Sequence, residues 1–396
     1  MMPQTAVREE LLTHDAVAPT IIGAGAAARA LPRLGATKNA LLVIDDRVHQ
    51  EHPELALRVR RLVRHDPAGE AQSALLERVA RDTAGEPAFE AVIGIGGGSV
   101  LDAAKLMRLA LQSAASFRSA RRRAIAYGVS LLPESKGSGA PSLALIPTTV
   151  GTGSEASAVA CLHPDTGDSR RLVVGRLMRA DTVVLDTTLT RSLPDRGVRE
   201  GAAEILLRLL GSYVGSPAAA VPDAAAEELV DRVATVVAAG LSGGFDDGLR
   251  ERLAVASTET HTGWALTGRA AYAAKHWYLA NELSSVARAG KVPVTLMLLP
   301  AIWQRILTGD TRWGDAERLR RLWRIISLRL SLSADPVRGA VEWTGSWAMP
   351  DLRLSDGAIV SAARSCAQVW GGDRPALRGL TEDDVLDVYT ASIRGS

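Results

Sequence analysis

Short apolar runs alternate with segments of helical spacing between Thr20 and Asp186. The runs that predict strands are 20–22, 40–45, 91–95, 143–147 and 182–186. Helices are predicted between them at 69–82 and 99–112, because apolar side chains recur there every three or four residues. Strands that alternate with helices are typical of an α/β fold with a parallel sheet. We therefore expect a doubly wound domain over residues 1–187.

The strand pattern ends near residue 187, and longer segments rich in Ala, Leu, Val and Arg follow. The segments with helical spacing are 197–214, 224–239, 248–268, 271–288, 314–332, 356–370 and 381–393. An all-helical second domain, which would bind the substrate, is therefore expected over residues 188–396. All eight tryptophans lie in this half. Most are expected in its core, and a few could line a roomy pocket. The stretch 132–141 predicts a surface loop.

Composition narrows the class of protein. The 396 residues, 47% of them hydrophobic, suit two domains with a core each. The net charge is only +2, and basic clusters such as Arg121–Arg123 lack interleaved aromatic residues, so neither nucleic-acid nor membrane binding is expected. Two cysteines, Cys161 and Cys366, are too few for a disulfide framework. A polar N-terminus and the lack of a long apolar run favour a cytoplasmic protein.

The strongest local pattern is VIGIGGGSVLDAAK at 92–105, an apolar strand that runs through three glycines into a helix. Glycine lets backbone N–H groups approach a phosphate, and the helix N-terminus attracts anions. A second loop, IPTTVGTGSEASA at 146–158, also follows a predicted strand. Two such loops on neighbouring strands predict a cofactor crevice; two unrelated polar turns are the alternative. The expected cofactor contacts are Gly96, Gly97, Gly98, Ser99, Asp102, Thr148, Thr149, Thr152 and Ser154.

The pairing of GGGSVLDAAK with PTTVGTGSEAS resembles the iron-containing alcohol dehydrogenase and glycerol dehydrogenase superfamily, to which the dehydroquinate synthases are related. The resemblance implies a Rossmann-like domain in which Asp45 ends the second strand and faces the adenosine ribose. A carboxylate there hydrogen-bonds a 2′-hydroxyl and repels a 2′-phosphate, so NAD is expected rather than NADP. Asp46 leaves this register open by one residue, and a turn residue is the alternative. Arg170 and Arg171 could pair with cofactor phosphates, where the family often has a lysine; arginines on a surface strand are the alternative.

The resemblance also implies a metal site, since the family usually binds a divalent metal through one aspartate and three histidines of the helical domain. Only His261 and His276 lie beyond His163. The positions that match the family's ligands are Glu204, Arg208, His276 and Lys291. A guanidinium cannot ligate a metal, and an ammonium must first lose its proton. We therefore expect no divalent metal; Glu204, His276 and His261 would be the ligands if one were bound.

Fixed charges could replace the metal. Glu204 and Arg208 are four residues apart, so they share one helix face, and Lys291 comes from a separate segment. The two cations could stabilise a developing alkoxide or hold a substrate carboxylate. His276 is the candidate for proton transfer, with a structural helix histidine as the alternative. His261 is expected to serve packing.

The leading hypothesis is reversible hydride transfer between NAD and an alcohol or carbonyl carbon, in a cleft between the two domains. The cations favour a carboxylate-bearing small-molecule or peptide substrate. A concrete option in natural-product biosynthesis is oxidation of a C-terminal β-hydroxy acid, such as the threonine of a peptide, followed by loss of carbon dioxide. An NAD-using cyclase resembling the dehydroquinate synthases and a non-catalytic paralogue remain as alternatives. A homodimer is expected from analogy with the superfamily alone.

Overall fold

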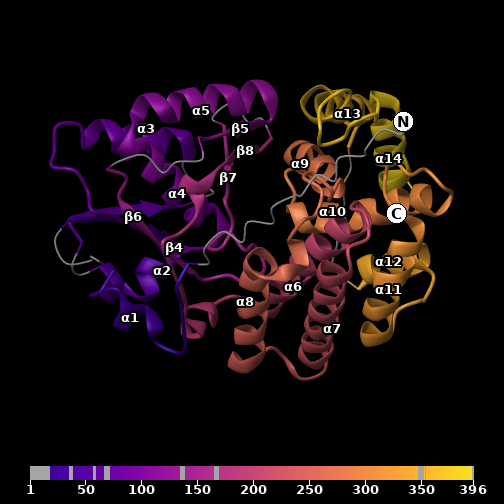
Figure 1. Ribbon diagram of the computed structural model, residues 1–396, viewed down its shortest axis with the longest axis horizontal. Helices are drawn as coiled ribbons and strands as arrows, with labels where there is room; N and C mark the ends of the chain where they lie inside the picture. The colour runs from indigo at the N-terminus through magenta and orange to yellow at the C-terminus, as the bar shows by residue number, and fades with distance from the viewer. Residues whose placement is uncertain are drawn as a thin grey trace, which may run out of the picture.

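The computed structural model has an α/β part followed by a helical part (Figure 1). It describes residues 18–34, 39–56, 59–66, 72–133, 139–164, 169–346, 352 and 354–394. The two parts lie side by side, with the helical part built from the second half of the chain (Figure 1). This arrangement confirms the fold class expected from the alternation of apolar and polar positions.

Six parallel strands form the main sheet, in the order β1-β9-β6-β4-β2-β3. Their bounds in that order are Thr20–Ile22, Thr182–Leu185, Ser142–Pro147, Ala91–Gly96, Ala40–Asp45 and Arg61–His65. The five predicted strands are all present. The sixth, β3, was not predicted, because its sequence Arg-Leu-Val-Arg-His holds only two apolar residues. It lies at the edge of the sheet, where polar side chains are tolerated.

Helices cover both faces of this sheet, and alternate residues of β2 show how. Leu41 and Val43 pack into the core under α3 and α4, whereas Leu42 and Ile44 pack into the core under α1 and α2. The helices α1, α2, α3, α4 and α5 span Ala26–Ala30, Asp46–Glu51, Gln72–Asp82, Gly98–Gln112 and Ala114–Tyr127. A strand buried on both faces is apolar throughout, which is why β2 and β4 stand out in the sequence.

A second, three-stranded sheet of order β5-β8-β7 packs beside α4 and α5. Its strands are Val129–Leu131, Arg171–Val174 and Val159–Leu162. None was predicted, since three or four residues carry too little periodicity to separate a strand from a turn. The predicted loop at 132–141 follows β5, and residues 134–138 of it lie outside the described part of the chain. This small sheet places Cys161 and Arg170 beside the cleft described below.

Within its described residues, the helical part contains all seven helices that the sequence predicts, and two more. The helices α6 to α14 span Asp195–Val214, Ala220–Gly243, Asp247–Thr262, His276–Ala287, Lys291–Leu307, Ala316–Leu330, Pro336–Gly345, Asp356–Trp370 and Glu382–Arg394. The unpredicted helices are α10 and α12. The helix α8 ends six residues earlier than expected, because Gly263 and the left-handed Gly268 interrupt the chain. A cluster of Trp303, Trp323 and Trp343 fills the core, as expected of most tryptophans.

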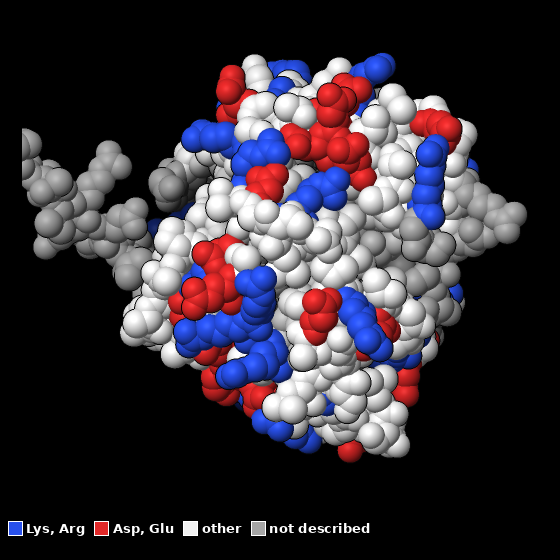
Figure 2. All heavy atoms as spheres, turned by 90° about the vertical axis from the view of Figure 1, so that its right-hand side faces the viewer, with Lys and Arg blue, Asp and Glu red and all other residues white. Residues whose placement is uncertain are grey.

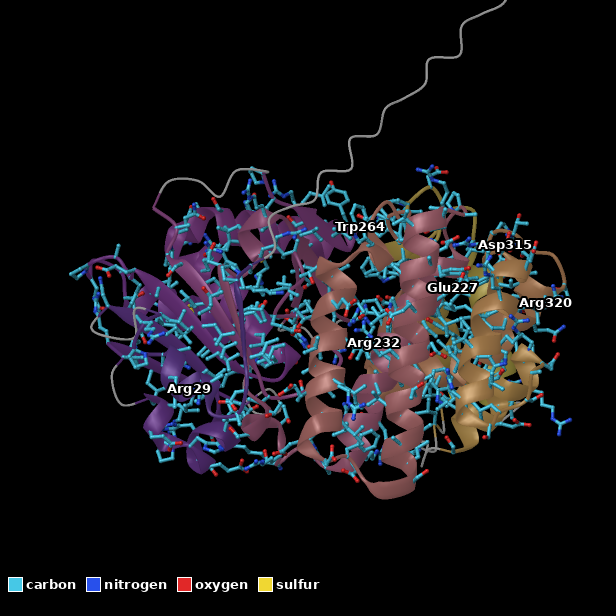
Figure 3. The ribbon with its side chains drawn as sticks, turned by 60° about the horizontal axis from the view of Figure 1, so that its bottom comes forward. Arg29, Glu227, Arg232, Trp264, Asp315 and Arg320 are labelled. Carbon is cyan, nitrogen blue, oxygen red and sulfur yellow. The ribbon has the colours of Figure 1, made fainter. Side chains whose placement is uncertain are left out.

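Charges of both signs are interspersed on the end of the molecule formed by the last helices (Figure 2). Many belong to ion pairs between neighbouring helices: Arg321 and Arg329 of α11 pair with Glu227 and Asp231 of α7. On the other side of α7, Arg232 pairs with a carboxylate of α8 (Figure 3). Within the described residues, no helix combines the length and the apolar character needed to cross a membrane.

Candidate functional site

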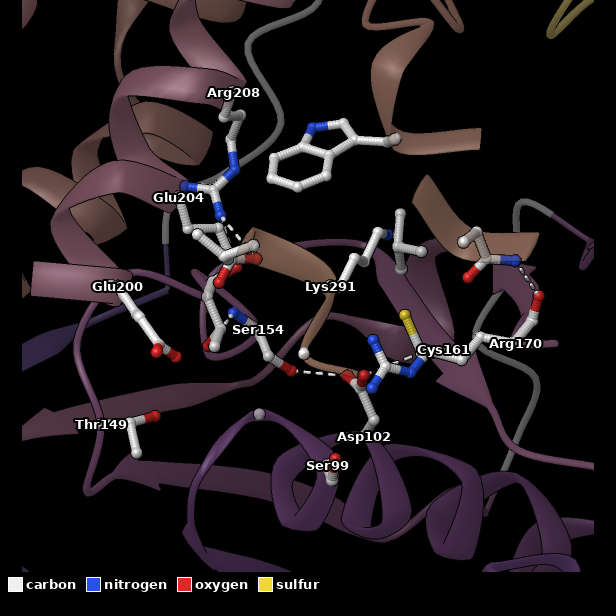
Figure 4. Close-up of a pocket in the computed structure, with 18 of the residues that line it drawn as sticks. Ser99, Asp102, Thr149, Ser154, Cys161, Arg170, Glu200, Glu204, Arg208 and Lys291 are labelled. Carbon is white, nitrogen blue, oxygen red and sulfur yellow. Dashed lines mark hydrogen bonds and ion pairs between the residues drawn. The ribbon is translucent and has the colours of Figure 1, made fainter. Parts of the chain in front are cut away.

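A cleft of about 530 Å³ opens where the carboxyl ends of β4 and β6 face helices α6, α9 and α10. Figure 4 shows Ser99, Asp102 and Ser154 on the sheet side, with Arg208 and Lys291 reaching in from the helical side. The predicted residues that line it are Gly98, Ser99, Asp102, Thr149, Thr152, Ser154, Glu204, Arg208, His261 and Lys291. The structure therefore brings together both predicted loops and three of the four positions that match the family's metal ligands.

The first loop is shaped by its glycines. The strand β4 ends at Gly96, Gly97 caps α4, and the helix begins at Gly98. A Cβ on Gly98 would lie 3.0 Å from Cγ2 of Thr152, so the glycine lets the two loops approach closely. The first N–H groups of α4 have no acceptor within the helix and meet the cleft at this point. The result is a cradle of backbone donors that suits a phosphate.

The second loop is seated directly on helix α6. The N–H of Thr148 donates to the carbonyl oxygen of Gly96 over 3.0 Å, which joins the two loops. Three residues later, Gly151 adopts a φ of 101° and touches the backbone of Gly201. A Cβ on either glycine would lie 2.1 Å from a carbonyl oxygen of the other segment. Both glycines are therefore required by the close approach of the loop to the helix.

Asp102, a predicted cofactor contact, lines the cleft but has both carboxylate oxygens engaged. Ser154 Oγ donates to Oδ1 over 2.6 Å, and the Cys161 N–H donates to Oδ2 over 3.0 Å. Lys105 lies 3.6 Å from the same carboxylate. Asp102 thus ties the second loop and strand β7 to helix α4, which makes it a positioning residue.

Lys105 is fully buried. No role was predicted for it from the sequence. Its Nζ donates to the carbonyl oxygen of Val159 over 2.7 Å and to both the carbonyl and the hydroxyl oxygen of Ser157. Burial lowers the pKa of its ammonium group, against the opposing effect of Asp102 and Glu155. A buried amine that donates to three oxygens anchors the chain that leaves the second loop.

Arg208 lies in the cleft wall, and the loop occupies most of its hydrogen-bonding capacity. Its Nη2 donates to the carbonyl oxygens of Gly151 and Thr152, each over 2.7 Å, and Nη1 donates to Thr260 Oγ1 over 3.1 Å. Glu204, one helical turn earlier, lies 3.8 Å away, which confirms that the two share a helix face. Burial lowers the pKa of the guanidinium, and it stays charged nonetheless. Arg208 therefore holds the second loop against α6.

Lys291 begins helix α10 and extends its ammonium over the indole ring of Trp277, with Nζ 4.9 Å from the ring centroid. Among the described residues, no carboxylate lies within ion-pair distance of this Nζ. Burial is the main cause that lowers the pKa of Lys291, and the charges of Arg170 and Arg208 lower it further. A cation in a partly desolvated cleft beside an aromatic ring attracts a developing negative charge.

Of the two arginines proposed to meet a cofactor, the structure turns Arg171 away from the cleft. Arg171 is buried, where it pairs with Glu282 over 3.3 Å and donates to the carbonyl oxygen of Ser169 over 2.9 Å. Arg170 lines the cleft instead, and its carbonyl oxygen accepts a hydrogen bond from Asn281 over 2.8 Å. Of these two consecutive arginines, Arg171 is thus part of the buried structure and Arg170 faces the cleft.

His276 does not line the cleft. Its ring packs against Gly211 of α6 and borders a separate small cavity, about 20 Å³, with Trp303 and Trp313. Burial lowers its pKa to about 3, and Lys291 adds to the effect. His276 is thus not among the residues that line the cleft, and its role in proton transfer stays a prediction.

His261 does line the cleft and packs on the second loop. A Cβ on Gly153 would lie 2.5 Å from its ring, so the left-handed glycine makes room for the imidazole. Its Nε2 is buried and has no hydrogen-bond partner among the described residues. Burial holds the pKa of His261 well below its usual value, and Arg208 contributes. The imidazole is therefore neutral at pH 7.

Asp45 lies at the carboxyl edge of the sheet, as the sequence predicts, beside the end of β4. Its side chain accepts the N–H of Arg47 over 3.0 Å and so begins helix α2. The neighbouring Asp46 is turned toward Arg64 and Gln50. Of the two aspartates, Asp45 is thus the one that ends β2 and caps helix α2. It lies beside strand β4, which leads into the first loop.

Several cleft residues were not predicted from the sequence. Glu200 lies one turn before Glu204 on α6 and pairs with Arg196 over 3.0 Å. The other unpredicted lining residues include Cys161, His163, Trp277, Tyr278, Asn281 and Trp370. The spacing of Glu200 and Glu204 could have revealed the acidic side of the cleft, because residues four apart share a helix face. The others come from segments that only the fold brings together.

The side chains at the family's ligand positions do not suit a divalent metal. In the cleft these positions offer one carboxylate, Glu204, and the cations Arg208 and Lys291. The cleft also holds the imidazole of His261 and the carboxylate of Glu200, which pairs with Arg196. Nowhere in the described ranges do three or more His, Cys, Asp or Glu side chains gather in a way that could hold a metal ion. Two fixed positive charges repel a divalent cation, and catalytic zinc usually has three protein ligands.

Known proteins resemble this chain in sequence. Residues 18–187 match the family model described as iron-containing alcohol dehydrogenase. The chain is 29% identical over 180 residues to a sulfoacetaldehyde reductase of Bilophila wadsworthia, a match that covers 45% of this chain and 43% of that protein. It is 23% identical over 310 residues to the probable alcohol dehydrogenase EutG of Salmonella typhimurium, covering 78% of this chain and 74% of that one.

Solved structures extend the likeness to the whole fold. The NADH-dependent butanol dehydrogenase A of Thermotoga maritima superposes with a TM-score of 0.79 at 15% identity, covering 96% of this chain and 98% of that one. An iron-containing alcohol dehydrogenase from Thermococcus thioreducens superposes with a TM-score of 0.75 at 18% identity, covering 97% and 100%. Residues 18–187 thus match the iron-containing alcohol dehydrogenase family, and the whole chain is similar in fold to solved structures of such dehydrogenases.

Proposed function

We propose that this protein is a metal-independent oxidoreductase, which transfers hydride between NAD and the carbonyl or alcohol carbon of a substrate that carries a carboxylate or a related anion. The observation that carries the proposal is the position of Lys291. It places an ammonium group, with no carboxylate within ion-pair distance among the described residues, in the same cleft as both phosphate-type loops. The named relatives are dehydrogenases and reductases, which supports the reaction class.

The cofactor's place follows from the two loops. The backbone donors at Gly98 and Ser99 would hold the pyrophosphate, and Thr149 and Thr152 offer hydroxyl groups beside it. Asp45, at the neighbouring strand end, would accept the ribose 2′-hydroxyl, so the proposal is for NAD rather than NADP. Bound in this way, the nicotinamide supplies or accepts the hydride.

Lys291 would stabilise the negative charge that develops on the substrate oxygen. In the reducing direction the carbonyl carbon gains a hydride, its oxygen becomes an alkoxide, and the Lys291 ammonium donates the proton that completes the alcohol. The amine then regains a proton from solvent. Burial lowers the pKa of Lys291, which brings its donor strength closer to neutral pH. In the oxidising direction the neutral amine accepts the hydroxyl proton as hydride leaves.

Arg208, which the sequence analysis paired with Lys291, supports this chemistry indirectly. Its two Nη2 hydrogen bonds to Gly151 and Thr152 fix the loop that would carry the cofactor. Its charge also contributes to the positive potential at Lys291. Glu204 balances part of that charge from 3.8 Å. We therefore assign Arg208 and Glu204 to positioning and Lys291 to catalysis.

The test is NADH oxidation or formation over a panel of aldehydes, hydroxy acids and peptides that end in threonine. Lys291→Met should lower kcat about 100-fold or more, because it removes both the cation and the proton, while the Kd for NADH stays within twofold. For threonine-ending peptides the balanced reaction consumes NAD and gives NADH, a proton and a β-keto acid, which then takes up a proton and releases carbon dioxide. Carbon dioxide is therefore measured alongside NADH.

Each outcome of that assay decides between the alternatives. Binding of NADH with no turnover of any panel member would indicate a non-catalytic paralogue. An equal loss of NADH affinity and kcat in Lys291→Met would mean that the lysine shapes the cofactor site instead of acting on the substrate. Failure to bind NADH at all would overturn the proposal.

A further inference from the structure

When the ion-pair partners of the charged side chains in the cleft are assigned, two cations are left without a carboxylate in the described part of the chain. Asp102 lies beside Lys105, Glu200 pairs with Arg196, and Glu204 pairs with Arg208. Each carboxylate in the cleft wall is thus matched by a cation. Two cleft cations remain, Arg170 and Lys291, and neither has a carboxylate within ion-pair distance among the residues that the structure describes.

Arg170 is presented to the cleft by a fixed backbone. Its carbonyl oxygen accepts hydrogen bonds from Asn281 over 2.8 Å and from Arg171 Nη1 over 3.3 Å. Arg171 in turn is paired with Glu282 of α9, so the residue next to Arg170 is anchored on the helical part. An arginine on a fixed backbone loses less conformational freedom when it binds a ligand than one on a mobile loop.

Two titratable side chains near Arg170, Cys161 and His163, are uncharged at pH 7. Figure 4 shows Arg170 beside Cys161, on the far side of Lys291 from Arg208 and Glu204. Burial raises the pKa of the Cys161 thiol to about 11, so it is protonated at pH 7. Burial, with the charge of Arg170, lowers the pKa of His163 to about 4, so this imidazole is neutral. This end of the cleft is positive, whereas Glu200 and Glu204 lie at the other end.

We propose that Arg170 anchors the anionic group of the substrate, a carboxylate or sulfonate, while Lys291 faces the reacting oxygen of the same molecule. The guanidinium offers paired N–H donors that match two oxygens of such a group. The inference rests on the proposed function, because it assigns the two cations to two ends of one substrate. It differs from the sequence-based assignment, in which Arg208 supplied the second cation.

The substrate class follows from this assignment. It is a short aldehyde, or the matching alcohol, with an oxyanion a few bonds from the reacting carbon. A long neutral alcohol would leave Arg170 desolvated and unpaired, which costs free energy. A relative of this chain is named for sulfoacetaldehyde, a two-carbon aldehyde that carries a sulfonate. That name supports the size and the charge of the class.

The test compares Arg170→Gln with Arg176→Gln, a control on an exposed arginine outside the cleft. Sulfoacetaldehyde and succinate semialdehyde are the anionic probes, and butanal is the neutral one. Arg170→Gln should raise KM for both anionic aldehydes about 10- to 100-fold, as expected from loss of a charged hydrogen bond. KM for butanal, and the Kd for NADH by fluorescence, should stay within twofold. Arg170→Lys should recover part of the loss.

A second measurement keeps the anion site separate from hydride transfer. Succinate and ethanesulfonate are titrated by calorimetry into the NADH-saturated protein, where no reaction occurs. Weaker binding in Arg170→Gln, with unchanged binding in Arg176→Gln, supports the anion site even if no aldehyde is reduced. A rise in the NADH Kd of Arg170→Gln would place the guanidinium on the cofactor phosphates and overturn the proposal. Equal KM changes for butanal and the anions would also overturn it.

Discussion

Gly151 and Gly201 touch backbone to backbone: a Cβ on Gly151 would lie 2.1 Å from the Gly201 carbonyl oxygen. This contact joins the second loop to helix α6, so the proposed cofactor loop and the helical part meet without intervening side chains. The φ of 101° at Gly151 adds a second requirement for glycine. The position of the second loop against α6 is therefore fixed by two residues that come from different halves of the chain.

Gly201→Ala should lower the free energy of unfolding by about 1 to 3 kcal/mol, because the added methyl group meets the Val150 carbonyl oxygen at 2.1 Å. It should also weaken NADH binding, since the loop must move away from α6. Thermal unfolding and a fluorescence titration measure the two effects. Gly243→Ala is the matched control, because a Cβ there meets nothing within 4 Å. Equal stability of the two variants would contradict the close approach.

Arg208→Lys should weaken NADH binding about tenfold, although the charge is kept. A lysine cannot donate to Gly151 and Thr152 with the planar geometry of the guanidinium, so the loop loses two charged hydrogen bonds. The readout is the Kd for NADH. An unchanged Kd with a lower kcat would show instead that Arg208 acts on the substrate, as the sequence analysis supposed.

Glu282→Gln should be strongly destabilising, by about 3 kcal/mol or more, because it leaves the buried Arg171 without its counter-charge. The carboxylate also accepts hydrogen bonds from Ser365 and from the indole N–H of Trp370. Arg329→Gln breaks an ion pair whose partners are both largely exposed, so it should change stability by less than about 1 kcal/mol. Urea unfolding of both variants measures the contrast. Similar losses in the two would contradict it.

The buried His276 predicts a dependence of stability on pH. Burial lowers its pKa from 6.5 to about 3. The unfolded chain binds a proton at this residue below pH 6.5, and the folded chain does not. Stability must therefore fall as pH drops from 6.5 toward 3, by up to about 1.4 kcal/mol per pH unit for this residue. His163, whose pKa is lowered to about 4, acts in the same direction.

His276→Asn should make that fall shallower. The free energy of unfolding is measured by urea titration at several pH values between 6.5 and 4 for both proteins. The variant's slope should be smaller by about 1 kcal/mol per pH unit, whatever its stability at pH 7. Identical slopes would mean that His276 gains its proton in the folded state as easily as in the unfolded one.

The central strands β2, β4 and β6 of the main sheet could be predicted because they are buried on both faces and are therefore almost wholly apolar. The same signal is absent from β3, where Arg61, Arg64 and His65 are polar, and from the three short strands of the second sheet. Those elements exist because neighbouring strands offer hydrogen-bonding partners. A three-residue segment such as Val129–Leu131 carries no such information in its own sequence.

The site residues, like the strands, fall into those that local sequence predicts and those that it does not. Spacing alone places Glu204 and Arg208 on one face, since helix geometry fixes residues four apart. Whether Arg170 or Arg171 faces the cleft depends on Glu282, more than a hundred residues away in the chain. The orientation of His276 depends on the space that Gly211 leaves in α6. Contacts between distant segments decide these choices, and local sequence does not record them.

Metal content is the sharpest test of the proposed chemistry. We expect purified protein to contain well under one equivalent of iron, zinc or nickel, and turnover to be unaffected by a chelator or by added metal. A divalent ion in the cleft would meet the charges of Arg208 and Lys291, and among the described residues no three carboxylate, thiol or imidazole side chains gather in a way that could hold it. Glu204 already lies 3.8 Å from Arg208, so a metal would also have to displace that pairing.

Glu204→Gln separates the two mechanisms. If Lys291 acts without a metal, this variant loses one of several partners of Arg208, and kcat should fall less than tenfold while metal content stays low. If a metal acts, Glu204 is the carboxylate at the family's ligand position in the cleft wall. Removing it should then abolish both stoichiometric metal and turnover. Stoichiometric, chelator-sensitive metal that disappears in Glu204→Gln would refute the replacement of the metal by fixed charge.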